Sequence, residues 1–175
     1  TSQIKAVATS AIQAMSVDQI FGLITAQIAA VGTEQLAALS AKQIAGMEAA
    51  DVQALGSDQL RSLSTAQVRA FTSAQATALT SGQVKALTTS QVNALSSAQV
   101  KALDTVDLAA MGTDQIQALS TAGVAGLSSD QMTALTSTQF KSMAAAQLAT
   151  LSNSQIKTVD TVDLAQLSTD QLQSL

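Results

Sequence analysis

The stretch LTTSQVNALSSAQVKAL, residues 87–103, states one eight-residue phrase twice, and the phrase continues along almost the whole chain. One column of this repeat, taken in steps of eight from Val7 to Leu175, is apolar at all 22 positions. A second column, from Ile4 to Leu172, is also apolar at all 22 positions, and a third is mostly Ala. The chain is therefore a continuous array of octads, and the octad decides the fold.

The polar columns of the octad predict a helix start. The residue after each member of the leucine column is Ser, Thr, Asp or Gly in 17 of 21 octads, and the third residue after that is Gln in 17 of 22. Ser or Thr followed at the third position by Gln is a capping box: the hydroxyl accepts from a free amide of the first turn, and Gln accepts from the amide of the cap residue. Leu87 and Val92, which flank the box of Thr88 and Gln91, provide the hydrophobic staple.

The spacing of the apolar columns excludes the common alternatives. A continuous helix would turn the leucine column by about 80° per octad, so the column could not stay on one face. A coiled coil needs apolar spacings of 3 and 4, whereas this array has 3 and 5. A strand fails because the two columns differ in parity. We therefore predict helical segments of about one and a half turns, with a bend at every cap.

Segments this short must stack, because isolated helices below about 12 residues are marginal in water. We predict an all-α fold: a solenoid, or superhelix, of very short capped helical segments, one per eight-residue repeat, with both apolar columns facing inward. The Ala column lets neighbouring segments approach closely.

The charged residues support this frame. All 12 acidic residues fall in the predicted N-terminal turn of a segment. Seven of the eight basic residues lie two residues after the box position, toward the C-terminal end. This is the distribution that the helix dipole favours. The column that carries the basic residues should face solvent.

Composition excludes several classes of function. The 175 residues are 47% hydrophobic and contain no Cys, His, Trp, Tyr or Pro. Catalysis needs an activated nucleophile or a tuned acid and base, and Ser recurs here as a cap in every part of the array, so we expect no enzyme. A net charge of -4 offers no footprint for nucleic acid. No apolar run reaches the roughly 18 residues of a membrane span, so we expect no membrane insertion.

We treat residues 1–175 as a single repeat domain of about 22 octads, either a whole chain or a fragment of a longer array. DTVDLAAMGTDQIQAL at 104–119 returns as DTVDLAQLSTDQLQSL at 160–175. The resulting 56-residue super-repeat divides the chain into 48–103, 104–159 and 160–175. One interpretation is a superhelix with about seven octads per turn, which would stack Asp51, Asp107 and Asp163 along one side. The other is segmental gene duplication without geometric meaning.

The acidic octads contain the candidate metal ligands. Carboxylates stand three residues apart in the pairs Glu48 with Asp51, Asp104 with Asp107, and Asp160 with Asp163. Such oxygen ligands could gather around calcium. The alternative is that they replace Ser at the cap and Gln at the box, where the helix dipole favours negative charge. Because no Gly-centred ligand loop accompanies them, we predict no metal site and no cofactor.

Two further positions depart from the pattern. Phe21 lies near Ile24, which occupies a cap position, and together they could form an exposed apolar contact patch. The alternatives are packing against a neighbouring chain and a terminal irregularity. Gly123 replaces the box Gln and should weaken one segment locally.

The octad, as LTTSQVNA or LSSAQVKA, resembles the Ala-, Thr- and Gln-rich octapeptide arrays of some very large bacterial exoproteins of the adhesin type, which are secreted or surface-attached. The resemblance covers the whole chain and carries over no functional residues. It implies an elongated, non-catalytic segment that is extracellular or on the bacterial cell surface.

Three functions fit these observations. The first is a structural stalk or scaffold segment of a large bacterial surface or secreted protein. The second is a filament subunit that stacks end to end through an open core. The third is a repetitive Ser/Thr surface that binds ice or glycan, suggested by hydroxyl pairs such as Thr88 with Thr89. The expected partners are other copies at the solenoid ends or adjacent domains of the same polypeptide.

Overall fold

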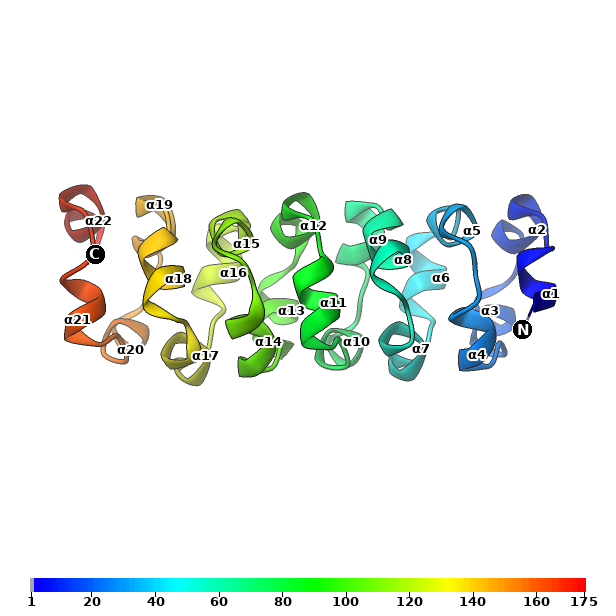
Figure 1. The fold of residues 1–175 in the computed structure, drawn as a ribbon, viewed down its shortest axis with the longest axis horizontal. Coiled ribbons are helices and arrows are strands. Elements are labelled where there is room, and N and C mark those ends of the chain that lie inside the picture. The colour runs from blue at the N-terminus through cyan, green and yellow to red at the C-terminus, as the bar shows by residue number, and fades with distance from the viewer. Residues whose placement is uncertain (1) are drawn as a thin grey trace.

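The computed structural model describes residues 2–175 and arranges them as a rod of short helices, with the N-terminus at one end and the C-terminus at the other (Figure 1). Over these residues the structure has 22 helices, one per octad, and no strand. The predicted all-α solenoid of short capped segments is confirmed. None of the described helices has the length and apolar character of a membrane span.

The helices are α1 (Ser2–Lys5), α2 (Thr9–Gln13), α3 (Val17–Phe21), α4 (Thr25–Ile28), α5 (Thr33–Ala37), α6 (Ala41–Ala45), α7 (Ala49–Gln53), α8 (Ser57–Ser62), α9 (Thr65–Arg69), α10 (Ser73–Thr77), α11 (Ser81–Ala86), α12 (Thr89–Ala94), α13 (Ser97–Ala102), α14 (Thr105–Ala110), α15 (Thr113–Ala118), α16 (Thr121–Ala125), α17 (Ser129–Ala134), α18 (Ser137–Ser142), α19 (Ala145–Leu148), α20 (Asn153–Ile156), α21 (Thr161–Leu164) and α22 (Thr169–Ser174).

The caps bend the chain between helices. Thr88, which precedes α12, has the extended backbone angles φ -71° and ψ 157°, and its side chain accepts from the backbone N of Gln91. The extended cap prevents one helix from running into the next, so the chain changes direction in each octad. A hydroxyl accepts in this way at Ser16, Ser40, Ser64, Thr72, Thr80, Thr88, Ser96, Ser120, Ser128, Thr136, Ser152 and Ser168.

The superhelix closes one turn within four octads. Helices pack against the third helix that follows them, as α11 packs on α14 and α10 on α13. Side-chain hydrogen bonds connect residues 28 and 31 positions apart, as Gln99 does with Phe71 and Val68. The interpretation of seven octads per turn is therefore wrong. The 56-residue super-repeat is twice the 28-residue spacing, so it spans about two turns.

The core is a continuous apolar column along the rod. Val92 and Leu95, which represent the two apolar columns, are both buried, and the same columns are buried through most of the array. The basic column lies on the outside, where Arg69, Lys85 and Lys101 are exposed, as predicted. With only 2% aromatic residues, the core consists of small aliphatic layers, and neighbouring turns lie close together.

The Ala column is where neighbouring turns approach most closely. Gly126 stands in this column, and a Cβ placed on it would collide with the side chain of Ser97, one turn earlier, and come within 3.0 Å of the Ser97 carbonyl oxygen. Gly46 is in the same position against a side-chain methyl of Val17. The predicted close approach is confirmed, and at these two positions the approach is too close even for Ala.

We expect Gly126→Ala to lower the free energy of unfolding by about 1–3 kcal/mol, because the methyl group forces the two turns apart. Gly82→Ala is the matched control: the nearest atom to its added Cβ is the Thr80 Oγ1, at 4.0 Å. Gly82 lies within α11, so there Ala should stabilise by about 0.5–1 kcal/mol. Urea unfolding followed by circular dichroism measures both, and equal effects of the two substitutions would contradict the packing described.

Candidate functional site

The distinctive polar feature of the structure is a buried glutamine that joins two turns. Gln99 in α13 is 2% exposed. Its Oε1 accepts from the backbone N of Ser96 at 2.8 Å, which completes the predicted capping box. Its Nε2 donates to the carbonyl oxygen of Val68 at 2.9 Å and to that of Phe71 at 2.8 Å. One amide group therefore caps its own helix and binds the end of a helix in the preceding turn.

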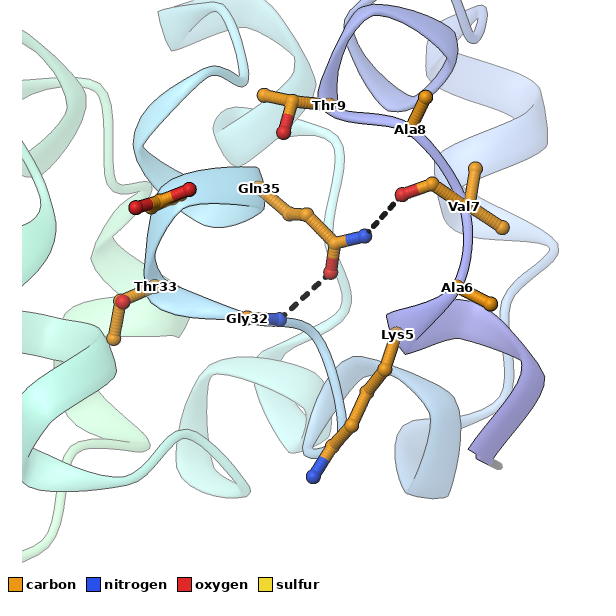
Figure 2. A pocket seen from close by; sticks show the side chains of 9 residues that line it. Lys5, Ala6, Val7, Ala8, Thr9, Gly32, Thr33 and Gln35 are labelled. Atoms are coloured by element: carbon orange, nitrogen blue, oxygen red, sulfur yellow. Dashed lines mark hydrogen bonds between the residues drawn. The ribbon is translucent and has the colours of Figure 1, made fainter.

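We call this arrangement a glutamine bridge: Oε1 accepts from the cap amide, and Nε2 donates to the carbonyl oxygen 28 residues earlier. Figure 2 shows it at Gln35, between the backbone N of Gly32 and the carbonyl oxygen of Val7. The bridges are formed by Gln35, Gln43, Gln59, Gln67, Gln75, Gln83, Gln91, Gln99, Gln115, Gln131, Gln139, Gln147, Gln155 and Gln171. Their Nε2 to oxygen distances are 2.5–2.9 Å.

The bridges explain how so many polar side chains lie in the core without destabilising it. A buried amide without partners costs about 1–3 kcal/mol. In the part of the chain that the structure describes, no buried side-chain nitrogen or oxygen lacks a hydrogen-bond partner. The same bonds also satisfy carbonyl oxygens at the C-terminal ends of the short helices, which have few partners within their own helix.

The second donor role of Gln was missed in the sequence, although a signal for it was present. A capping box accepts either Glu or Gln, because both have an oxygen for the cap amide. At the box position this chain uses Gln in 17 of 22 octads and never Glu. Only Gln can also donate. The exclusive choice of the amide therefore indicates an acceptor beyond the local box.

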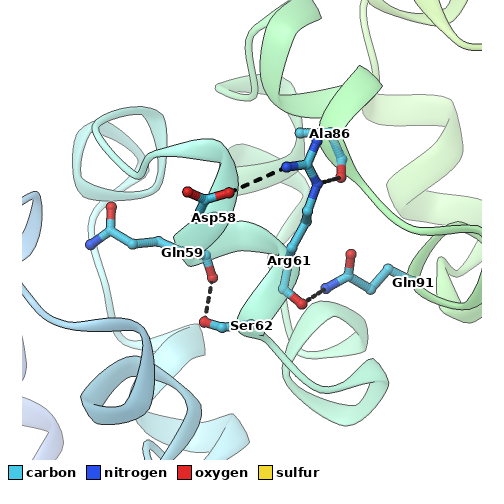
Figure 3. Close-up of polar contacts among 6 residues, drawn as sticks. All are labelled: Asp58, Gln59, Arg61, Ser62, Ala86 and Gln91. Carbon is cyan, nitrogen blue, oxygen red and sulfur yellow. Dashed lines mark hydrogen bonds and ion pairs between the residues drawn. The ribbon is translucent and has the colours of Figure 1, made fainter.

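A second set of bonds runs in the opposite direction along the rod. Arg61 donates from Nε to the carbonyl oxygen of Ala86 at 3.2 Å, while its Nη1 pairs with Asp58 at 3.3 Å (Figure 3). Thr77 and Asn93, in the same column, also donate to a carbonyl oxygen 25 residues later, at 2.9 and 3.0 Å. The Arg61–Asp58 pair is exposed, so it contributes little to stability.

The candidate metal ligands are placed as isolated pairs. Asp51 is buried, and its Oδ2 accepts from the backbone N of Glu48 at 3.3 Å. Asp107 is buried as well and accepts from the Ser81 hydroxyl at 2.5 Å. About two turns separate these residues, so their carboxylates do not meet. Among residues 2–175, no group of three or more His, Cys, Asp or Glu side chains could hold a metal ion.

The cap interpretation of the acidic pairs holds only in part. Asp51 fills the box role, with its oxygen on the cap amide. Glu48, Asp104 and Asp160 occupy cap positions, but their side chains form no cap hydrogen bond. Asp at the box position is also shorter than Gln and cannot donate, so it forms no bridge. At Asp163 a cavity of about 70 Å³ lies between its side chain and those of Met132 and Phe140.

Gly123 interrupts the bridges in the middle of the array. The box hydroxyl of Ser120 still caps α16 by accepting from the Gly123 backbone N at 3.0 Å. A Gln here would reach the carbonyl oxygens of Val92 and Leu95, which lie 31 and 28 residues earlier. The predicted local weakness therefore has a defined cause: one bridge between neighbouring turns is missing.

The predicted contact patch is exposed. Phe21 at the end of α3 is 56% exposed, and Ile24, the cap residue of α4, is 62% exposed. Its role in binding stays a prediction. The cap residue of the hydroxyl pair Thr88 and Thr89 is already occupied, because its Oγ1 accepts from the backbone N of Gln91 at 3.2 Å.

The surface hollows lie between turns and contain few functional groups. One of about 590 Å³ surrounds the Gln35 bridge and is lined mainly by backbone and small side chains, with Lys5 and Glu34 at its edges (Figure 2). Another, of about 380 Å³, is lined by the hydroxyls of Ser97 and Ser128 and by Lys101. Neither brings together the acid, base and nucleophile of a catalytic site.

Comparison with known families now places the chain. A family model described as ALTTAQ repeat matches residues 44–81, 52–89, 77–105 and 100–137. The matches together span 44–137, more than half of the 175 residues. The chain belongs to the ALTTAQ repeat family. No curated protein matches it. The octapeptide part of the predicted resemblance is confirmed by this ALTTAQ match, and the match is to a repeat rather than to an enzyme.

Replacing the bridge at Gln99 should destabilise the array strongly. We expect Gln99→Ala to lower the free energy of unfolding by about 3 kcal/mol, because it leaves the amide of Ser96 and the carbonyls of Val68 and Phe71 without this partner. Gln99→Glu keeps the acceptor for Ser96 but turns a carboxylate toward carbonyl oxygens, so it should cost at least as much.

Urea unfolding measures both variants. Gln117→Ala is the control, because Gln117 is exposed and its change should stay within about 0.5 kcal/mol. If Gln99→Glu were as stable as the unmodified chain, Gln99 would be a helix cap and nothing more.

Restoring the missing bridge should stabilise the array. Gly123→Ala should contribute about 1 kcal/mol from helix propensity. Gly123→Gln should add about 1 kcal/mol from the hydrogen bonds to Val92 and Leu95. The comparison of their unfolding midpoints isolates the bridge. A Gln variant no more stable than the Ala variant would show that the amide makes no net contribution there.

Proposed function

We propose that this chain is a non-catalytic structural segment, an elongated stalk or scaffold within a large bacterial secreted or surface protein. The observation that carries the proposal is the succession of glutamine bridges from Gln35 to Gln171, which ties turn to turn along the rod. A protein built this way sets a fixed distance between whatever is attached to its two ends.

The bridges also support stiffness. Each one lies at the contact between two turns, and in the middle of the array it is buried, as at Gln75 and Gln91. Bending the rod would open these contacts and leave carbonyl oxygens and amides without partners, which is costly in the core. Each turn contacts only its neighbours, so length can change by whole repeats without changing the rest.

The remaining chemistry agrees with a structural role. The chain has no His and no Cys, and many of its hydroxyls serve as helix caps, as Ser64 and Thr136 do. The proposed role requires no cofactor. The extracellular or surface location is supported by the resemblance of the octad to repeat arrays of bacterial exoproteins.

Removal of one super-repeat tests the proposal. Deleting residues 104–159 joins Leu103 to Asp160 and preserves the octad phase. The shortened chain should fold with the same helix content per residue. In small-angle X-ray scattering, its maximum dimension should fall by roughly a third, because 56 of 175 residues are removed.

The matched control is a deletion of residues 104–155, which removes a similar length but shifts the octad phase by half a repeat. It should disrupt the stack. If the in-phase deletion collapsed to a compact particle, or if both deletions behaved alike, the chain would not act as a modular spacer.

A further inference from the structure

The two faces of a turn of this solenoid carry different side chains. In the first turn Ile12 and Ile20 are buried, whereas Met15 and Leu23, from the leucine column, are only partly buried. The leucine column therefore faces toward the preceding turn. We call Val7, Met15 and Leu23 with the amides of Gln19 and Gln27 the donor face.

The opposite end shows the complementary arrangement. Leu167, from the leucine column, is buried, whereas Ile156 and Leu164 are only partly buried, and Leu172 is 48% exposed. The second apolar column therefore faces toward the following turn. We call Ile156, Leu164 and Leu172 with the carbonyl oxygens of Leu164 and Leu167 the acceptor face.

The hydrogen-bonding groups of the two faces match. Gln19 and Gln27 cap their helices through Oε1, at 2.8 and 3.0 Å, as every bridging Gln does. The carbonyl 28 residues before each of them would lie before residue 1 of this chain. At the other end, Leu164 accepts one backbone bond, from Leu167. A carbonyl oxygen can accept two, as Leu36 does from Leu39 and Gln67.

The register of the octads also matches across a junction between copies. Leu175 closes one octad, and Thr1 stands at the position after a cap. If a second copy continues the phase with one cap position between them, Gln19 falls opposite Leu164 and Leu167 at the spacing of the internal bridges. In the same register, Gln27 falls opposite Leu172.

We propose that this 175-residue chain associates head to tail with copies of itself, the donor face of one docking on the acceptor face of the next. The contact repeats the one between internal turns, with the same apolar columns and glutamine bridges. Face-to-face pairing of like ends is excluded by chemistry, since it would oppose donors to donors or carbonyls to carbonyls. Because the contact joins unlike faces along the rod axis, it produces linear chains and not closed dimers.

This inference is independent of the stalk role, which requires only that the rod keep its length. Sedimentation velocity over a hundredfold range of protein concentration tests it. We expect species that grow without limit as the concentration rises. A monomer at all concentrations would overturn the proposal, and so would a dimer that does not grow further.

Two variants, each damaging one face, identify the contact. Met15→Asp places a charge on the donor face, and Leu172→Asp places one on the acceptor face. Each alone should sediment as a monomer. Their mixture should form dimers and nothing larger, because one intact face remains on each chain. Growth in either variant alone, or a mixture that stays monomeric while the unmodified chain grows, would contradict head-to-tail docking.

Circular dichroism establishes that each variant is folded. If either aspartate variant is unfolded, the double variant Gln19→Glu with Gln27→Glu replaces it, because both side chains lie on the donor face and the Glu oxygen can still cap the helix. Its association should weaken at least tenfold. The lateral variant Lys101→Glu is the control, and it should grow as the unmodified chain does.

Discussion

The glutamine bridge is the interaction on which the rest of the structure depends. Helices of four to six residues fall below the length at which a helix holds itself together in water. A cap at one end contributes only about 1 kcal/mol. The bridge adds what the cap lacks: it attaches the start of one short helix to the end of another in the preceding turn, and it does so inside the apolar core. Each helix is therefore stabilised from both ends by a neighbour.

The bridge also accounts for the strict octad. The amide must meet its own cap residue three positions earlier and a carbonyl 28 positions earlier. An insertion of one residue anywhere between would break this second contact and rotate both apolar columns out of the core. The constraint acts on every octad between the two partners, and this gives a physical reason for a phase that never slips in 22 repeats.

Much of the fold could be predicted from the sequence because its determinants are local. The cap hydroxyl, the box Gln and the staple, as in Thr88, Gln91 and Val92, lie within five residues of one another, and the structure has them as predicted. The size of the turn could not be predicted, because it depends on how closely the Ala column packs against the next turn. The second role of Gln was missed for the same reason, since its acceptor is found only once the turn size is known.

The candidate site was predicted less well than the fold. The acidic pairs stand out in sequence because charge is rare in this chain, yet the structure places Asp51 and Asp107 two turns apart, in positions where a bridge is missing. Their spacing of 56 residues reflects two turns rather than one. Gly123 was recognised as a weak point, and the structure adds which carbonyls lose their partner there.

The most direct test of the glutamine bridge is hydrogen exchange at the side-chain amides, measured by nuclear magnetic resonance on the nitrogen-15-labelled chain. If the bridges exist, the Nε2 protons of Gln75, Gln91 and Gln99 will exchange far more slowly than those of exposed Gln117. If all four exchange alike, at the rate of a free side chain, the turns are not joined through glutamine and the account is wrong.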